Sequence, residues 1–256
     1  MTHNIFRHPG IVSGIATENG TVATMCSDGH SRMFNPTGSL LAAEFEGWGI
    51  NSIAMRNGEI ATDTGLSILH EGVAISVDGE VVRGSDFAAP YILDICKSGT
   101  WGVGTDQFCY NRITKFVFRC VPLAAGSDKW PMGIEEFQDG SLVVVAHDGF
   151  ARVFAPDGTQ LAHWQVSANG LCAVDVAANG IIAIADYTFN VSRYSPTGTL
   201  LSRCSLQSLP HAVQFDGSIV LIGMHTGELL WWDGANGDAP VQIISTPVRT
   251  KPGKRK

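Results

Sequence analysis

The chain has 256 residues and a formal net charge of −7, with 45% hydrophobic and only 16% charged residues. This balance argues against a disordered chain, and the acidic excess argues against a nucleic-acid groove on the folded body. No apolar stretch approaches the roughly 20 residues that a membrane-spanning helix needs, so we expect no membrane segment.

The first repeat unit shows how the chain is organised. A short apolar run over residues 13–16 leads through the turn ENG to a second strand-like run, TVATMC, and then to a turn at Asp28. A third run ends at Phe34, and the turn NPTG leads into a fourth, SLLAAEF. Asn-Gly and Pro-x-Gly steps are turn signals, so this unit predicts four antiparallel strands.

The same turn sequences recur along the chain. Polar-polar-Gly turns place their glycines at intervals of 38, 41, 41, 40 and 37 residues, at Gly20, Gly58, Gly99, Gly140, Gly180 and Gly217. A period of about 40 residues is typical of four-stranded propeller blades. A lone four-stranded sheet leaves both faces in water, whereas blades arranged radially cover one another.

We therefore expect an all-β fold, a single β-propeller over residues 1–247 with six blades of four antiparallel strands, and seven blades as the alternative. The expected blades are residues 9–46, 47–87, 88–125, 130–167, 168–207 and 208–245. Residues 64–80 and 107–123 lack the Pro-x-Gly turn, so the second and third blades are the least regular. Residues 248–256 are basic and predict a disordered tail.

An aspartate follows the second strand of most repeats. These residues are Asp28, Asp63, Asp106, Asp148 and Asp186, with Thr226 in the last repeat. Carboxylates around one rim could bind a metal or transfer protons, but a short aspartate also accepts hydrogen bonds from its own turn. Because the residue recurs once per repeat, we interpret the series as structural.

The segment FDGSIVLIGMHTGELLWWD at residues 215–233 resembles the second half of a tryptophan-aspartate (WD) repeat, ending in Trp232 and Asp233. The resemblance implies four-stranded antiparallel blades in which the turn aspartates named above brace each blade. Only the last repeat carries the Trp-Asp ending, and the Gly-His pair that opens such repeats is absent. The chain thus resembles a divergent WD-repeat propeller.

Other polar residues leave alternatives open. His30, His70, His147 and His225 fall near corresponding positions and could converge on zinc, but no His-x-His or His-x-x-x-His spacing occurs. In the pair Glu135-Glu136 one side chain must point away from the expected face, either as a channel-lining carboxylate with a raised pKa or as a solvated group. Without a nucleophile motif, we predict no catalytic residues, no metal and no cofactor.

Large aromatic residues mark the loops that join successive blades. Such side chains suit the anchors of an interface, although they could instead fill gaps between blades. Nearby acids would favour a basic protein or peptide. The predicted partner-binding residues are Trp48, Phe87, Tyr91, Trp130, Glu46 and Asp128.

These features favour a non-catalytic protein-interaction platform, a scaffold or accessory subunit that binds its partner on the loop rim. One alternative is a propeller enzyme with a channel-mouth, metal-assisted hydrolytic site. Another is a nucleic-acid-associated subunit that uses the tail at residues 248–256. The first ten residues lack the apolar core of a secretion signal and the six cysteines form no C-x-x-C pair, so we expect a cytoplasmic protein with free thiols.

Overall fold

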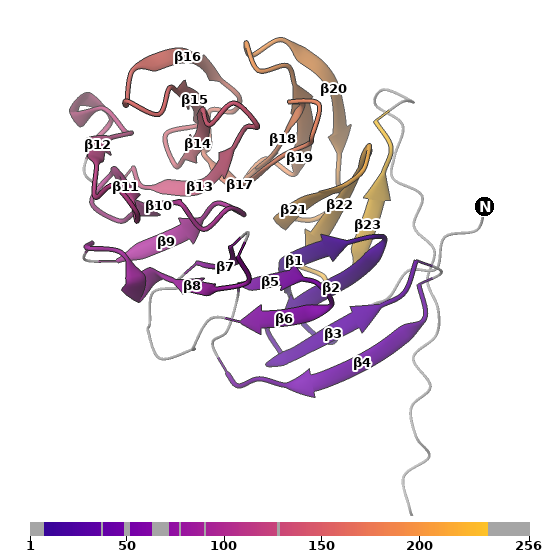
Figure 1. Ribbon diagram of the computed structural model, residues 1–256. Helices are drawn as coiled ribbons and strands as arrows, with labels where there is room; N and C mark the ends of the chain where they lie inside the picture. Colours follow the sequence, from indigo (N-terminus) through magenta and orange to yellow (C-terminus); the bar gives the residue numbers. More distant parts are fainter. Residues whose placement is uncertain are drawn as a thin grey trace, which may run out of the picture.

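The computed structural model describes residues 8–36, 38–48, 52–62, 72–76, 78–89, 91–126 and 129–234. Small antiparallel sheets surround a common centre, so the predicted all-β propeller is confirmed (Figure 1). The only helical segments in these ranges are two 3-10 turns, η1 (Gly84–Asp86) and η2 (Leu123–Ala125). No helix in the described part of the chain has the length and apolar character to cross a membrane.

Five sheets have three or four strands, and we number them as blades in chain order. The first contains β1 (Val12–Glu18), β2 (Thr21–Cys26), β3 (His30–Phe34) and β4 (Leu40–Phe45). The second contains β9 (Ile92–Ile95), β10 (Trp101–Gly104), β11 (Phe108–Asn111) and β12 (Val117–Arg119). The third contains β13 (Pro131–Glu136), β14 (Leu142–Ala146), β15 (Phe150–Phe154) and β16 (Gln160–Gln165). The fourth contains β17 (Leu171–Val176), β18 (Ile182–Asp186), β19 (Asn190–Tyr194) and β20 (Leu200–Ser205), and the fifth contains β21 (Pro210–Asp216), β22 (Ile219–Met224) and β23 (Leu229–Trp232).

The expected six blades, and the alternative of seven, are wrong, because the described residues form five blades. Between the first and second blades lie two separate hairpins, β5 (Ile53–Arg56) with β6 (Glu59–Thr62), and β7 (Val73–Ile75) with β8 (Val81–Arg83). The turn glycine Gly58 does join β5 to β6, as its repeat position predicts. The next strand, β7, pairs with β8 and not with β6, so the four strands do not form one sheet.

The Asn-Gly hairpins form as the sequence predicts. Asn19 and Gly20 connect β1 to β2 with φ of 51° and 76°, and Asn57 and Gly58 connect β5 to β6 with φ of 52° and 77°. Two positive φ angles in a two-residue loop are the geometry that Asn-Gly favours, because its twist matches that of the paired strands.

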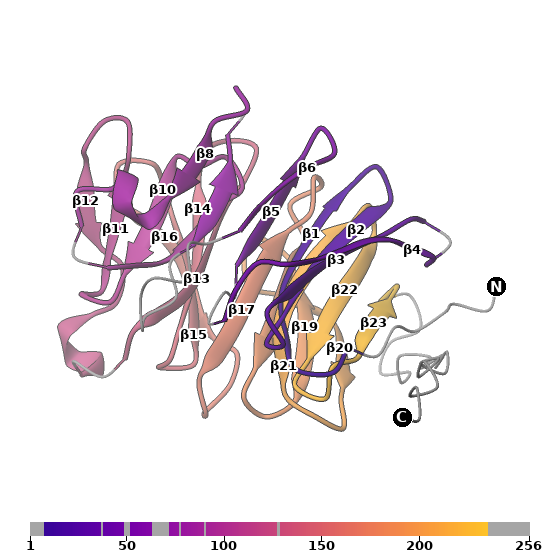
Figure 2. The same cartoon turned by 90° about the horizontal axis from the view of Figure 1, so that it is seen from below.

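The core lies between neighbouring blades. The second strands are buried on both faces, and every residue of β14 and of β18 is buried. The first strands of the five blades and of both hairpins contact one another in sequence around the centre, with β1 closing the circle against β21. Figure 2, turned by 90°, shows β1 beside β5, its neighbour in this circle.

The ring closes through the start of the described chain. The backbone N–H of His8 donates to the carbonyl oxygen of Gly227 at 2.7 Å. Glu46 makes the same bond to Gly29 in the first blade, and Val166 makes it to Gly149 in the third. In the first and third blades the residue that makes this bond follows the outer strand. His8 takes the corresponding position beside the fifth blade.

Candidate functional site

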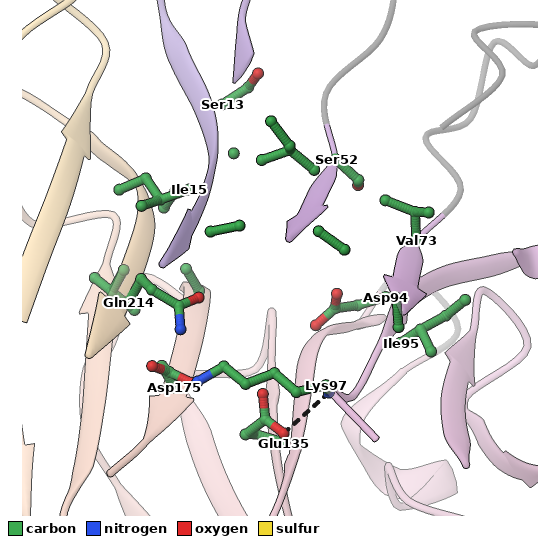
Figure 3. A pocket seen from close by; sticks show the side chains of 18 of the residues that line it. Ser13, Ile15, Ser52, Val73, Asp94, Ile95, Lys97, Glu135, Asp175 and Gln214 are labelled. Carbon is green, nitrogen blue, oxygen red and sulfur yellow. Dashed lines mark hydrogen bonds and ion pairs between the residues drawn. The ribbon is translucent and has the colours of Figure 1, made fainter. Parts of the chain in front are cut away.

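A cavity of about 690 Å³ lies at the centre of the ring, bordered by the first strands of the blades and hairpins (Figure 3). Side chains alternate along a strand, so each of these strands directs every second side chain inward. On β1, β5 and β7 the lining residues are mixed, with Ile15, Ile53 and Val73 beside the polar Ser13, Thr17 and Arg56. On β9, β13, β17 and β21 they include charged and amide groups, so most of the carboxyl groups lie on one side of the cavity, which we call the polar wall.

An ion pair spans the polar wall. Lys97, in the turn after β9, places its Nζ 2.5 Å from Oδ1 of Asp175 on β17. Oδ2 of Asp175 accepts the backbone N–H of Phe215 on β21 at 2.5 Å. The Asp175 side chain is only 2% exposed, whereas the Lys97 side chain is 47% exposed because it borders the cavity.

Gln214 completes this pair from β21. With its amide oriented so that both groups are satisfied, its oxygen accepts from Lys97 Nζ at 2.7 Å and its nitrogen donates to the carbonyl of Ile15 at 3.3 Å. The ammonium group of Lys97 is thus held by a carboxylate and an amide on two adjacent blades.

Glu135 on β13 is 7% exposed and points into the cavity. Its Oε1 accepts the backbone N–H groups of Lys97 at 3.2 Å and of Glu136 at 2.9 Å. Burial raises the pKa of Glu135 to about 8, against the opposing effect of Lys97 and with a smaller contribution from Asp175. The carboxyl group therefore exchanges a proton near neutral pH.

Asp94 on β9 is the second carboxyl group with a raised pKa. Its Oδ2 accepts the backbone N–H of Ile134 on β13 at 2.9 Å. Burial raises its pKa to about 7, although hydrogen bonds from Ile134 and Ile95 act in the opposite direction. Two carboxyl groups on adjacent strands of the cavity wall thus titrate near neutrality, which is typical of functional sites.

A sequence signal for these residues exists but was missed. Asp94, Glu135 and Asp175 each stand five residues before a turn glycine of the repeat. Asp94 and Asp175 both accept a backbone N–H from the next blade, 40 residues further on. Glu135 instead binds Lys97 of the preceding blade, so it departs from the pattern that its neighbours follow.

Of the pair Glu135-Glu136, the structure places the first residue in the cavity wall. Glu136 turns away, and its Oε2 accepts the hydroxyl of Ser98 at 2.5 Å. Of the two alternatives for this pair, the position of Glu135 agrees with a carboxyl group that lines the channel, where burial raises its pKa.

One histidine, His211, borders the cavity and lies against a second, His225. Nε2 of His211 lies 3.0 Å from Nδ1 of His225, and burial together with His225 lowers the pKa of His211. Cys172 and Tyr187 also border the cavity. No group of three or more His, Cys, Asp or Glu side chains in the described ranges is arranged to hold a metal. His70 lies outside those ranges.

The turn aspartates are bonded within their own turns. Asp28 and Asp148 each accept the backbone N–H two residues later and pair with an arginine four residues later, Arg32 and Arg152. Burial alone would raise the pKa of Asp28, but its bonds, led by that from Arg32, lower it to about 2. Asp186 accepts from Thr188 and Asn190, Asp106 accepts the hydroxyl of Tyr110, and Asp63 lies outside the described residues.

The predicted partner-binding residues fall into different environments. Trp48 is 73% exposed and packs edge-on against Phe45, and Tyr91 and Trp130 are exposed at the starts of β9 and β13. Phe87 is only 5% exposed and packs in the core with Ile92 and Ala74, so its ring is not presented to a partner. Glu46 accepts the hydroxyl of Ser31 at 2.6 Å, and Asp128 lies outside the described residues.

All six cysteines are free thiols. Five are buried, and Cys172 is partly buried at the cavity. Burial raises the pKa of Cys96 to about 12 and that of Cys172 further, so neither is a reactive thiolate at neutral pH.

No protein-family model and no curated protein matches this chain. Its fold is similar to that of virginiamycin B lyase from Staphylococcus aureus, at 13% identity and a TM-score of 0.68 over 88% of this chain and 96% of the other. A catalytically inactive variant of that lyase with quinupristin gives 12% identity and a TM-score of 0.69 over the same shares. The WD40 β-propeller domain of Doa1 is similar at 10% identity and a TM-score of 0.63, over 93% of this chain and 98% of the other. The chain is thus a β-propeller that is similar to WD-repeat propellers in fold and divergent from them in sequence.

Proposed function

We propose that this protein is a non-catalytic interaction propeller that binds a protein partner on the rim formed by its inter-blade loops. The observation that carries the proposal is Trp48, an indole 73% exposed on the loop after β4. Phe45 supports one edge of the indole, with ring centroids 5.7 Å apart. A supported, exposed tryptophan suits the centre of an interface, since tryptophan is enriched among residues that dominate binding energy.

Two more exposed aromatics belong to the same rim. The carbonyl of Tyr91 accepts the N–H of Thr105, and the carbonyl of Trp130 accepts the N–H of His147, so both residues lie beside turns between second and third strands. Gly47, next to Trp48, donates to Gly29 in the equivalent turn of the first blade. Tyr91 and Trp130 make the same contact before a first strand, and Trp48 follows an outer strand beside the corresponding turn, which supports a common rim for the three aromatics.

The partner that we propose is basic. Glu44 on β4 is exposed beside Phe45, and the chain as a whole carries a net charge of −7. Complementary charge steers association and discriminates against acidic surfaces. The WD40 propeller of Doa1 supports the fold on which the proposal depends. We also propose a cytoplasmic location, supported by the six free thiols.

The test is affinity purification from a cell lysate with the tagged chain, followed by quantitative mass spectrometry. Trp48→Ala and Trp130→Ala should each reduce recovery of the same basic protein by about tenfold or more, as expected for hot-spot residues. Leu161→Ala is the matched control, because Leu161 is exposed on the outer strand β16 and away from the loop rim. Equal recovery with the Trp48 and Leu161 variants would contradict the proposal.

A further inference from the structure

The central cavity has the size and the wall chemistry of a small-molecule site. Its volume of about 690 Å³ lies within the range of typical ligand pockets. One wall presents the apolar Ile15, Ile53 and Val73 among polar side chains such as Ser13 and Ser52, and the polar wall presents Asp94, Lys97, Glu135 and Asp175. A ligand that fits both walls has an apolar body and a polar head.

One carboxylate oxygen in the polar wall lacks a hydrogen bond. Both backbone N–H groups that reach Glu135 bind Oε1, and Oε2 accepts none from the residues that the structure describes. Glu135 is only 7% exposed and its carboxyl group faces the cavity (Figure 3). This oxygen is not one of the buried, unsatisfied atoms of the described residues; it is open to the cavity, where it can accept a hydrogen bond from a bound molecule.

The charges around the cavity favour a cation. The ammonium group of Lys97 is already bound by Asp175 and Gln214. Arg56 and Glu18 also border the cavity, where Arg56 interacts electrostatically with Glu18. Asp94 and Glu135 also face the cavity, and neither carboxyl group forms an ion pair among the described residues. Their hydrogen bonds from the protein come from neutral backbone N–H groups. An organic ammonium group is complementary to these two carboxyl groups, because it carries a positive charge and donates several hydrogen bonds.

We propose that the central cavity binds a small organic cation, a primary ammonium group on an aliphatic body. Glu135 and Asp94 accept hydrogen bonds from the ammonium group, and Ile15, Ile53 and Val73 cover the aliphatic part. This site is separate from the loop rim and does not depend on the rim's proposed function.

The state of the two carboxyl groups supports this assignment. Burial raises the pKa of Asp94 to about 7 and that of Glu135 to about 8, so both are partly protonated near neutrality. The charged groups that face them are Lys97 and Asp175, with the thiol of Cys96 behind Glu135. An arriving cation stabilises the ionised carboxylates and therefore displaces protons.

The first experiment compares three ligands of equal length on the unmodified protein at pH 8 by isothermal titration calorimetry. They are n-pentylammonium, n-pentanol and pentanoate. We expect saturable binding of one n-pentylammonium per chain, with the alcohol and the carboxylate at least about tenfold weaker. Absence of saturable n-pentylammonium binding, or equal binding of the alcohol, would overturn the proposal.

The second experiment uses neighbouring carboxylates as a matched pair. Glu135→Gln should weaken n-pentylammonium binding by about tenfold or more, because it removes the charge and keeps the shape. Glu136→Gln should leave binding unchanged, since Glu136 binds Ser98 and does not line the cavity. Equal effects of the two substitutions would contradict the assignment. Should Glu135→Gln fail to fold by circular dichroism, Asp94→Asn and the three-ligand comparison decide the question.

Discussion

His8 donates its backbone N–H to the carbonyl oxygen of Gly227 at 2.7 Å, although the two residues lie 219 positions apart. The imidazole Nδ1 of His8 lies 3.2 Å from the same oxygen, and Nε2 lies 2.8 Å from the Thr24 hydroxyl. Since a carbonyl oxygen only accepts, Nδ1 carries the proton and Nε2 accepts from Thr24. One neutral histidine thus joins the fifth blade to the first.

The close approach at Gly227 predicts a large cost for adding a methyl group there. Gly227 has a φ of +84°, and a Cβ atom would lie 2.2 Å from the carbonyl oxygen of His8. We expect Gly227→Ala to lower the free energy of unfolding by about 3 kcal/mol or more, from backbone strain plus displacement of His8. Urea denaturation measures the change.

Gly58→Ala is the control that measures the cost of backbone strain alone, without the clash with His8 that Gly227→Ala causes. Gly58 has a similar φ of +77°, and nothing lies within 4 Å of its Cβ position. Its substitution should cost only about 1 kcal/mol. Similar costs at both glycines would show that the contact with His8 does not hold the ring closed.

His8 also predicts a loss of stability in acid. Burial is the main cause that lowers its pKa from 6.5 to about 4, so the unfolded chain binds a proton that the folded chain excludes between these values. The free energy of unfolding should therefore fall as the pH drops from 6.5 to 4, by up to about 1.4 kcal/mol per pH unit. His8→Gln should flatten this dependence in thermal unfolding scans, whereas substitution of the exposed His163 should not. An unchanged slope in the His8 variant would contradict the buried neutral imidazole.

The sequence predicted the propeller because its turn chemistry is local. An Asn-Gly loop such as Asn19-Gly20 specifies a tight hairpin without reference to the rest of the fold. The number of blades depends instead on which hairpins join into one sheet. That pairing is long-range, and the hairpins β5–β6 and β7–β8 carry turns of the right kind without forming a common sheet.

The cavity was predictable only in part. Glu135 stood out because it interrupts an apolar strand, but Lys97 lies in a turn where a lysine is unremarkable. Its contact with Asp175 spans 78 residues and depends on the curvature of the ring. Exposed Trp48 and buried Phe87 occupy similar loop contexts in the sequence, and only tertiary packing separates them.

The cavity carboxyl groups predict a loss of stability toward alkaline pH. Their pKa values are raised in the folded protein, to about 7 for Asp94 and about 8 for Glu135, so the folded chain holds protons that the unfolded chain has released. The free energy of unfolding therefore falls as the pH rises toward the folded pKa of each group, by up to about 1.4 kcal/mol per pH unit for each. Between pH 4 and 6.5 His8 acts in the opposite direction, so the decline should be clearest from pH 6.5 to 8.

Asp94→Asn and Glu135→Gln test this sign, because neither amide titrates. Each should reduce the decline in denaturant midpoint between pH 6.5 and 8, and Glu136→Gln should preserve it. A midpoint that rises with pH in the unmodified protein would show that these carboxyl groups are ionised throughout.

Asp175 joins its own blade to two others, to the second through Lys97 and to the fifth through Phe215, and substitutions can separate the two contributions. Asp175→Ala removes the acceptor for Phe215 N–H and the counter-ion of Lys97, so we expect a loss of about 3 kcal/mol in the free energy of unfolding. Asp175→Asn keeps an acceptor for the backbone N–H. Because Lys97 is 47% exposed, water screens the lost charge, and the cost of Asp175→Asn should be nearer about 1 kcal/mol. Lys97→Met in the Asp175→Asn background should then cost less than in the unmodified protein, since only the contacts of Lys97 with Gln214 and Glu135 are left to lose. Equal losses for the alanine and asparagine variants would show that the ion pair with Lys97, rather than the hydrogen bond from Phe215, provides most of the stabilisation.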